Sequence, residues 1–320
     1  MNPQVSIIIP LYNKANYIAE TIESALLQTY RNKEIIVVDD GSSDNSIQIV
    51  SKLIIHNSNI KLIIRRREPK GASTCRNIGI QHSVGEYIIF LDADDILAPY
   101  CLAQRINLIT WQKELDFGVF LMQYFKNKPN DIQNIVNTLS NKDDISSFLS
   151  LDIPWPITSV IWKKESLCKL NGFNENYIRL QDPEIHLRAL LNNLKYEKFY
   201  DHSVDCYFRI GDSFKLKKQK KQLIASYLNF VSFFQDAILS EEKDEYLKDL
   251  KIAIPKLILS LSNVTIDVVS VYKMLIRLVD QRIIDKQTRS KYIILFIPNS
   301  IFRLTKSFVK QIIKGHSYNN

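Results

Sequence analysis

Three carboxylates within four residues, Asp92, Asp94 and Asp95, are the first candidates for chemistry in this sequence. They directly follow Tyr87–Leu91, an apolar run with the length and composition of a buried strand. Carboxylates this close repel one another, so a divalent cation would stabilise them. Mg²⁺ or Mn²⁺ suits oxygen ligands and is commonly held by one or two carboxylates together with substrate phosphates. The alternative is a turn that leads into a helix N-terminus, where aspartate is also favoured.

Two further apolar runs end in polar or aromatic residues. Val5–Pro10 is followed by Leu-Tyr12-Asn, and Glu34–Val38 is followed by Asp39 and Asp40. Both apolar runs have the length and composition of a short strand buried on both faces. These residues are therefore placed, like the acidic cluster, immediately after a strand.

The elements that must position these side chains alternate between strand and helix over the first hundred residues. The strands are expected at Val5–Pro10, Glu34–Val38, Ile60–Ile64 and Tyr87–Leu91, and the helices at about Ile18–Leu26, Ile47–Ile54 and Ala72–Gln81. Asn16 is a candidate N-cap of the first helix. This order predicts an α/β fold with a mostly parallel sheet flanked by helices, and ligands bind such sheets beyond the carboxyl ends of the strands.

The second half of the chain is less regular at first and then helical. Residues 116–215 contain candidate strands at Asp116–Met122, Val160–Trp162 and Lys195–Phe199 and a helix that begins near Gln181. Beyond residue 216, long segments carry apolar residues at helical spacing. We therefore predict one domain over residues 1–215, with halves 1–115 and 116–215, and a helical C-terminal region over residues 216–320.

Four segments together resemble glycosyltransferase family 2, the inverting enzymes with the GT-A fold. They are Val5-Ser-Ile-Ile-Ile-Pro-Leu-Tyr-Asn13, Val37-Val-Asp-Asp-Gly-Ser-Ser-Asp44, Gly71-Ala-Ser-Thr-Cys-Arg-Asn-Ile-Gly79 and Gly85-Glu-Tyr-Ile-Ile-Phe-Leu-Asp-Ala-Asp-Asp95. The resemblance spans residues 5–215. It implies transfer of a sugar from a UDP-sugar to a hydroxyl of a glycan or lipid-linked acceptor, in synthesis of capsule, O-antigen or lipooligosaccharide.

The resemblance assigns roles to the residues that follow the first two strands. Pro10 and Tyr12 are similar to residues that wall the nucleobase pocket in the family. Asp40 is similar to the carboxylate that accepts a hydrogen bond from uracil, and Asp39 beside it either faces the ribose or supports the turn. A capped turn before the next helix is the alternative for both carboxylates.

The resemblance also assigns roles around the acidic cluster. Asp92 and Asp94 match the family's D-x-D motif, with Asp94 the expected ligand of Mn²⁺ or Mg²⁺ and Asp92 nearer the ribose. Arg76 lies in a segment that relatives place near the nucleotide and sugar, where its paired donors would orient phosphate. Arg76 on a helix surface is the alternative, and Lys70 is a weaker candidate of the same kind.

The resemblance places the catalytic base in the stretch Leu180-Gln-Asp-Pro-Glu-Ile-His-Leu-Arg188. An inverting transfer needs a carboxylate to accept the proton of the attacking hydroxyl. Asp182 stands where the family has this base, although Gln181 replaces a common glutamate. The alternative is that Asp182 only caps a helix whose first residue is Pro183; Glu184 is the reserve candidate for the base.

Other residues of the second half have less specific patterns. His186 within the same helix is expected to be structural. Trp155 and Trp162 flank the segment where relatives bind the acceptor, so each either stacks on a sugar or packs in the core. Gly211 stands where many relatives have a histidine, which leaves the second metal ligand open.

The net charge of +8 is concentrated near the C-terminus. The last 35 residues contain no acid and the basic residues Lys286, Arg289, Lys291, Arg303, Lys306, Lys310 and Lys314. Apolar residues alternate with basic ones over Tyr292–Lys314, which predicts either an anchor on an anionic membrane surface or a docked terminal helix. Nucleic acid is not expected as a partner.

The remaining composition favours a cytoplasmic protein, peripheral on the inner face of the membrane if the tail is an anchor. The four cysteines form no C-x-x-C pair, which indicates a reducing compartment. We expect no signal peptide and no membrane-spanning segment. No glycine-rich phosphate loop follows the first strand, which disfavours nucleotidyltransferases and dinucleotide dehydrogenases. A non-catalytic relative that binds nucleotide-sugar or polysaccharide remains the alternative, although Asp94 and Asp182 are both present.

Overall fold

The computed structural model describes residues 2–66, 71–139, 141–210, 220–262, 268–280 and 283–292. The chain divides into two compact units, which are treated separately below. The first comprises Met1–Phe148 with Asp152–Ser213, and the second comprises Leu149–Leu151 with Phe214–Asn320.

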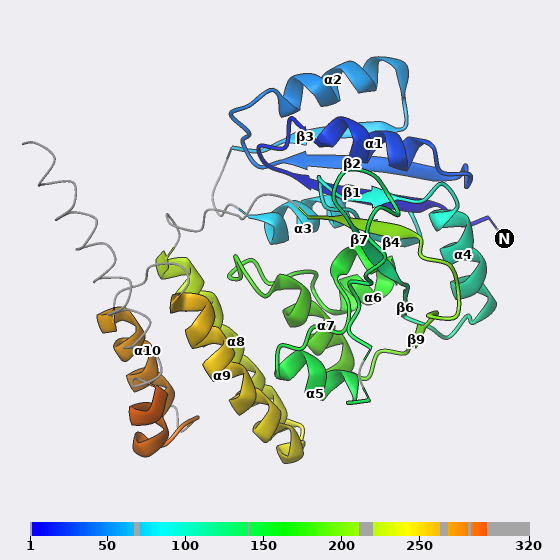
Figure 1. Ribbon diagram of the computed structural model, residues 1–320. Helices are drawn as coiled ribbons and strands as arrows, with labels where there is room; N and C mark the ends of the chain where they lie inside the picture. Colours follow the sequence, from blue (N-terminus) through cyan, green and yellow to red (C-terminus); the bar gives the residue numbers. More distant parts are fainter. Residues whose placement is uncertain are drawn as a thin grey trace, which may run out of the picture. The chain divides into compact units, whose positions relative to one another are not determined.

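The first unit is built on a seven-stranded sheet of order β3-β2-β1-β4-β8-β6-β9 (Figure 1). Its strands β1 (Val5–Leu11), β2 (Lys33–Asp39), β3 (Ile60–Ile64) and β4 (Tyr87–Phe90) are mutually parallel. β1 and β4 are central and almost wholly buried, as their continuous apolar sequences require. The α/β fold with a mostly parallel sheet is confirmed.

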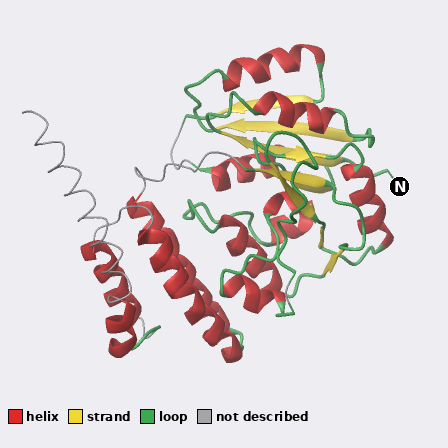
Figure 2. Cartoon of the chain, in the orientation of Figure 1, coloured by secondary structure: helices red, strands yellow, loops and turns green. Residues whose placement is uncertain are grey.

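Helices α1 (Ile18–Leu26), α2 (Ser46–His56) and α3 (Ala72–His82) connect these strands, and helices cover both faces of the sheet (Figure 2). α1 buries Ile18, Ile22 and Ala25 at helical spacing. The expected Asn16 cap is wrong, because Tyr17 precedes the helix and no side chain caps it. The chain therefore enters α1 without the side-chain acceptor that the sequence suggested.

The rest of the sheet is antiparallel or mixed. β8 (Val160–Lys163) runs antiparallel between β4 and β6 (Phe117–Val119), and β9 (Tyr196–Lys198) pairs with β6. The single strand expected at Asp116–Met122 is wrong. The chain leaves the large sheet after β6, and β7 (Met122–Phe125) joins a second sheet of order β5-β10-β7.

The small second sheet supports the residues that follow β4. It contains β5 (Ile96–Leu97) and β10 (Cys206–Arg209), which pair in antiparallel fashion directly after the acidic cluster. The other elements of this region are α4 (Cys101–Trp111), α5 (Asp144–Leu149), the short 3₁₀ turn η1 (Ile157–Ser159), α6 (Lys164–Lys169) and α7 (Gln181–Leu191). The helix expected near Gln181 is thus present as α7.

The second unit contains the helices α8 (Lys220–Ser240), α9 (Leu247–Ser262) and α10 (Val268–Asp280), with a 3₁₀ turn η3 (Asp244–Tyr246). α8 packs against both α9 and α10. Within the described residues, Leu223–Ser240 has the length and composition of a membrane span, and 44% of that window is buried; core helices of soluble proteins pass the same test. Residues 293–320, and with them the predicted basic anchor, lie outside the described residues.

Candidate active site

The loops after β1 and β2 are tied together at the carboxyl edge of the sheet. The backbone N–H of Asp40 donates to the carbonyl of Leu11 at 2.8 Å. The N–H of Asn13 donates to Ser42 Oγ at 2.9 Å, and Asn13 Oδ1 accepts from the N–H of Ser43 at 2.8 Å. The segment around Tyr12, whose ring is half exposed, is therefore held beside Asp40.

Asp40 is a buried carboxylate with a cationic partner. Its Oδ1 pairs with Arg65, which follows β3, and its Oδ2 accepts from the N–H of Gly71 at 2.8 Å. The N-cap position of α2 is Asn45, and Asp44 Oδ1 accepts from the N–H of Ser46, the first residue of the helix, at 3.0 Å. Asp40 is therefore not the cap of the next helix, and its carboxylate is held beside a guanidinium.

Asp39 supports the turn after β2. Its Oδ2 accepts from the N–H groups of Gly41 at 2.8 Å and Ser42 at 3.0 Å, and the side chain is fully buried. Gly41 has a φ of 80°, which favours glycine at this position. Asp39 Oδ1 is buried without a hydrogen-bond partner among the described residues. Contact with a ribose stays a prediction.

The three carboxylates of the acidic cluster have separate partners. Asp92 Oδ1 accepts from Arg76 at 2.7 Å, and Asp94 pairs with Lys14 from the loop after β1. Asp95 is 2% exposed, and its pKa is raised well above the ordinary value. The main cause is burial, and the negative charges of Asp92 and Asp94 add to it. Of these three carboxylates, Asp92 and Asp94 are therefore the two available to a ligand.

Asp95 is a structural carboxyl group. It accepts hydrogen bonds from the backbone N–H of Arg209 and from Thr158 Oγ1, both at 3.2 Å. The Arg209 side chain in turn donates from Nε to the carbonyl of Asp94 at 2.9 Å and pairs with Glu20. β10 thus holds the backbone of the acidic cluster in place.

Arg76 connects the acidic cluster to α7. Its guanidinium donates to Asp92 and, at 2.8 Å, to Gln181 Oε1, and it lies 5.2 Å from the ring centroid of Phe173. Arg76 is only 3% exposed, so the alternative of a helix-surface residue is wrong. The guanidinium therefore lies between the predicted nucleotide-binding half and the predicted base.

Asp182 lies in the first turn of α7 and is partly buried. Its Oδ2 accepts from the backbone N–H of Ile157 at 2.9 Å. The N-cap alternative is wrong, because α7 begins at Gln181 after Leu180 in the left-handed conformation. Burial raises the pKa of Asp182, with Arg76 opposing and Asp92 adding to the rise. A carboxylate with a raised pKa is better suited to accept a proton near neutrality.

The neighbouring candidates have structural roles. Glu184 is 1% exposed and pairs with Arg188, which also donates to the carbonyls of Leu170 and, at 2.7 Å, Gly172. Glu184, the reserve candidate for the base, therefore helps to hold the loop before α7 through Arg188. Asn77 holds the same loop, since its Oδ1 accepts from the N–H of Phe173 at 2.8 Å.

The aromatic candidates belong to the core. Trp155 and Trp162 are both fully buried, so the expectation that either stacks on an acceptor sugar is wrong. His186 stacks on Trp162 with centroids 5.7 Å apart and on Phe148 at 5.3 Å. Burial lowers the pKa of His186 to about 3, so the imidazole is neutral and structural.

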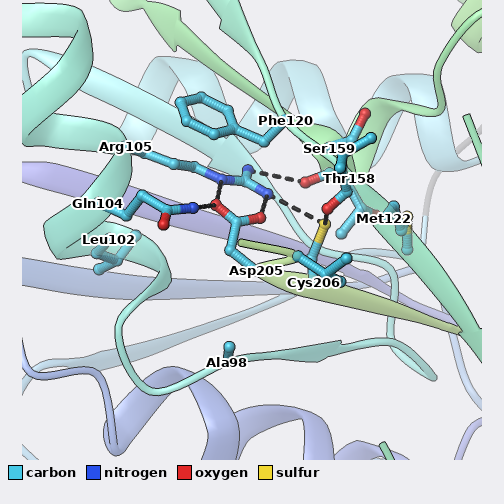
Figure 3. Close-up of polar contacts among 12 residues, drawn as sticks. Ala98, Leu102, Gln104, Arg105, Phe120, Met122, Thr158, Ser159, Asp205 and Cys206 are labelled. Atoms are coloured by element: carbon cyan, nitrogen blue, oxygen red, sulfur yellow. Dashed lines mark hydrogen bonds and ion pairs between the residues drawn. The ribbon is translucent and has the colours of Figure 1, made fainter. Parts of the chain in front are cut away.

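Arg105 and Asp205 form a buried ion pair (Figure 3). Arg105 on α4 donates to both carboxylate oxygens of Asp205 at 2.8 and 2.6 Å, and to the carbonyl of Thr158 at 2.9 Å. The turn η1 donates two further hydrogen bonds. The Thr158 hydroxyl donates to Asp95, and the Ile157 N–H donates to Asp182. The acidic cluster and the predicted base are fixed to one common turn.

The donors at this edge fit a divalent cation that substrate helps to bind. Within the described residues, no group of three or more His, Cys, Asp or Glu is arranged to hold a metal. Asp94 and Asp92 supply hard oxygen donors, which match Mn²⁺ or Mg²⁺ held by one or two carboxylates together with substrate phosphates. Gly211 lies outside the described residues.

Sequence reasoning did not find two cationic residues at this edge. Lys14 contacts Asp94 and lies in the loop after β1, and Arg65 contacts Asp40 and directly follows β3. Their positions after β1 and β3 were a usable signal, because the rule that selected the carboxylates applies to them equally.

The fold and this edge together define a GT-A unit: parallel strands β1 to β4, carboxylates at their carboxyl ends and a second small sheet behind the acidic cluster. The family model described as glycosyl transferase family 2 matches residues 6–168. The chain belongs to this family, and it is a glycosyltransferase.

Individual relatives agree with this assignment. An uncharacterized glycosyltransferase of Haemophilus influenzae is 30% identical over 76% of this chain and 93% of its own length. The UDP-Glc:alpha-D-GlcNAc-diphosphoundecaprenol beta-1,3-glucosyltransferase WfaP of Escherichia coli is 41% identical over 34% of this chain and 42% of WfaP.

Solved structures show the same fold. TarS of Staphylococcus aureus, residues 1–349 in complex with UDP, has a TM-score of 0.57 and 18% identity over 94% of this chain and 92% of that one. The mannosyltransferase PcManGT of Pyrobaculum calidifontis, in complex with GDP-Man and Mn²⁺, has a TM-score of 0.53 over 94% and 88%.

Proposed function

We propose that this chain is an inverting glycosyltransferase that moves a hexosyl or N-acetylhexosaminyl group from a UDP-sugar to a hydroxyl of a glycan or lipid-linked acceptor. The observation that carries the proposal is the position of Arg76. One guanidinium bonds both Asp92 of the acidic cluster and Gln181 beside Asp182. The groups needed for donor binding and for proton removal are thereby adjacent.

The nucleoside is bound at the ends of β1 and β2. Asp40, held by Arg65 and the Gly71 N–H, offers a fixed carboxylate to the imide N–H of uracil. The exposed ring of Tyr12 and the adjacent Pro10 form the wall against which the base lies. Asp39 and Asp92 are the groups nearest the ribose hydroxyls in this arrangement.

The diphosphate is bound between Asp94 and the cations around it. A divalent cation bound at Asp94 supplies charge neutralisation for the departing diphosphate. Asp94 would hold that ion, and the Arg209 bond to its carbonyl keeps the residue oriented. Arg76 contributes a fixed positive charge at the same edge, and Lys14 contributes a positive charge on a flexible side chain.

Asp182 is the base that accepts the proton of the attacking hydroxyl. The O–H bond of the acceptor breaks as its oxygen bonds the anomeric carbon, and the glycosidic bond to the diphosphate breaks on the opposite face. The α-linked donor therefore gives a β-linked product. The hydrogen bond from Ile157 holds one carboxylate oxygen, so the other is directed to the acceptor.

The relatives agree in chemistry with this proposal. TarS has been solved with UDP and with UDP-GlcNAc, and WfaP by its name transfers glucose from UDP-Glc to a lipid diphosphate. We assign catalysis to residues 1–215 and a helical accessory role to residues 216–320. By the same analogy we place the chain in the cytoplasm, in capsule, O-antigen or lipooligosaccharide synthesis. Contact of its basic tail with the inner membrane surface rests on the tail's sequence alone, and a docked terminal helix is the alternative.

The test is UDP release from a panel of UDP-sugars by the full chain, with Mn²⁺ or with chelator. We expect at least one UDP-sugar to be hydrolysed slowly in a metal-dependent reaction that Asp94→Asn abolishes. Loss of the reaction in Asp94→Asn with retention of fold by circular dichroism supports the proposal. Absence of both turnover and UDP binding in the wild type would refute it.

A further inference from the structure

Three carboxylates at the carboxyl edge of the sheet each have a cationic partner from this chain. Asp40 pairs with Arg65, Asp92 with Arg76, and Asp94 with Lys14. The two arginine side chains are 9% and 4% exposed, whereas Lys14 is 32% exposed. Lys14 is therefore the most accessible of the three cations.

The two kinds of cation differ in what they can do after pairing. The guanidinium groups of Arg65 and Arg76 are planar and lie in buried, fixed positions. The ammonium of a lysine is a compact charge on a flexible side chain. The backbone of Lys14 is fixed, since its N–H donates to Ser46 Oγ at 2.9 Å. Its Nζ lies 5.8 Å from the ring centroid of Tyr17. Because the backbone is fixed, rotation of the flexible side chain is what moves the ammonium to another partner.

The carboxylate that Lys14 contacts is the one that the proposed function assigns to the metal. An ammonium and a divalent cation cannot both occupy the contacted Asp94 oxygen, and in proximity they repel each other. Binding of the metal alone at that oxygen must therefore break the ion pair and leave Lys14 without its partner. A nucleoside diphosphate brings new anionic oxygens to the same edge and gives the displaced ammonium another partner.

We propose that Lys14 holds Asp94 until donor arrives and then transfers its contact from Asp94 to the diphosphate, so that metal and nucleotide bind cooperatively. This rests on the proposed function, because it requires a metal at Asp94 and a diphosphate beside it. The coupling is reciprocal: the factor by which UDP strengthens Mn²⁺ binding equals the factor by which Mn²⁺ strengthens UDP binding. Lys14 is a positioning and specificity residue in this scheme and takes no part in proton transfer.

The test measures Mn²⁺ binding directly, by loss of the free-ion electron paramagnetic resonance signal on titrating the full chain. Wild type, Lys14→Gln and the control Lys52→Gln, whose lysine is exposed on α2, are each titrated with and without UDP. Without UDP, Lys14→Gln is expected to bind Mn²⁺ about two- to fivefold more tightly than wild type, the size of effect measured for partly exposed ion pairs. The enhancement of Mn²⁺ binding by UDP is expected to fall by at least the same factor.

The outcomes separate this inference from the proposed function. Tighter Mn²⁺ binding with reduced coupling in Lys14→Gln, and wild-type behaviour in Lys52→Gln, supports the transfer of contact. Cooperative Mn²⁺ and UDP binding that is the same in wild type and Lys14→Gln refutes the role of Lys14 and leaves the proposed function intact. Absence of both Mn²⁺ and UDP binding in the wild type overturns the two together.

Discussion

Replacement of Asp182 by asparagine separates its chemical role from its structural one. The Asp182 Oδ2 atom accepts a hydrogen bond from the Ile157 N–H at 2.9 Å. The amide oxygen of asparagine can accept the same bond, whereas the amide cannot take a proton from an acceptor hydroxyl. Asp182→Ala removes both functions and leaves the Ile157 N–H without an acceptor, at a cost of about 1–3 kcal/mol in stability.

The expected loss of rate follows from the proton transfer alone. General base catalysis contributes about 10²- to 10⁴-fold, or roughly 2.7–5.5 kcal/mol of activation free energy. We expect Asp182→Asn to lower kcat for transfer by that factor while UDP affinity, measured by calorimetry, stays near the wild-type value. As the pH is lowered, the wild-type rate should begin to fall at a higher pH than an ordinary aspartate base would give, because burial raises the pKa of Asp182.

Stability provides an independent readout of the same substitution. A carboxyl group whose pKa is raised in the folded chain favours folding while protonated, and this contribution is lost as the pH rises through the folded pKa. At pH 7, Asp182→Asn should therefore be at least as stable as wild type, and Asp182→Ala less stable than Asp182→Asn. The control Asp201→Asn removes an exposed carboxylate and should change neither rate nor stability. Transfer by Asp182→Asn within threefold of wild type would refute the assignment of the base.

Three further substitutions test other parts of the site. Gln181→Glu places a second carboxylate beside Asp182, which raises the pKa of the base, so the acidic limb of the kcat/KM profile should move to higher pH; an unmoved limb contradicts this. Arg105→Met leaves Asp205 buried and unpaired, and should cost about 3–5 kcal/mol in urea denaturation; a loss under 1 kcal/mol would show that the pair is dispensable. Tyr12→Ala, at a half-exposed ring, should weaken UDP binding by about 1–3 kcal/mol without loss of stability, and unchanged affinity would exclude Tyr12 from the base-binding wall.

The parallel half of the fold was predictable because its strands are continuous apolar runs. Val5–Pro10 and Tyr87–Leu91 correspond to central strands buried on both faces, and helices follow them at regular intervals. The insertion of β8 between β4 and β6 was not predictable in the same way. A strand's sequence records that it is buried but not which neighbour it pairs with or in which direction.

The positions of the candidate carboxylates follow from strand ends, but their partners do not. Asp40, Asp92 and Asp94 each come within a few residues of a parallel strand, which places them at one edge of the sheet. Which cation reaches which carboxylate depends on side-chain length and loop path. Sequence spacing therefore could not pair Lys14 with Asp94 or Arg65 with Asp40.

Burial of single aromatic residues was also beyond sequence reasoning. Trp155 lies between two prolines in a segment without helical or strand periodicity, and its sequence context suits an exposed loop as well as a core. The structure buries it against Phe148 and His186, with centroids 4.9 and 5.6 Å away. The contact with His186 joins segments distant in sequence, which no local pattern records.

The central claim is that a UDP-sugar binds at the carboxyl edge of the sheet, between Asp40 and Asp94, within reach of Asp182. A crystal structure of the full chain with UDP and Mn²⁺ tests it most directly. The account predicts uracil hydrogen-bonded to Asp40, Mn²⁺ coordinated by Asp94 and the diphosphate, and the Asp182 carboxylate open to the donor side. A nucleotide bound elsewhere, or at this edge without contact to Asp40 and Asp94, would contradict it.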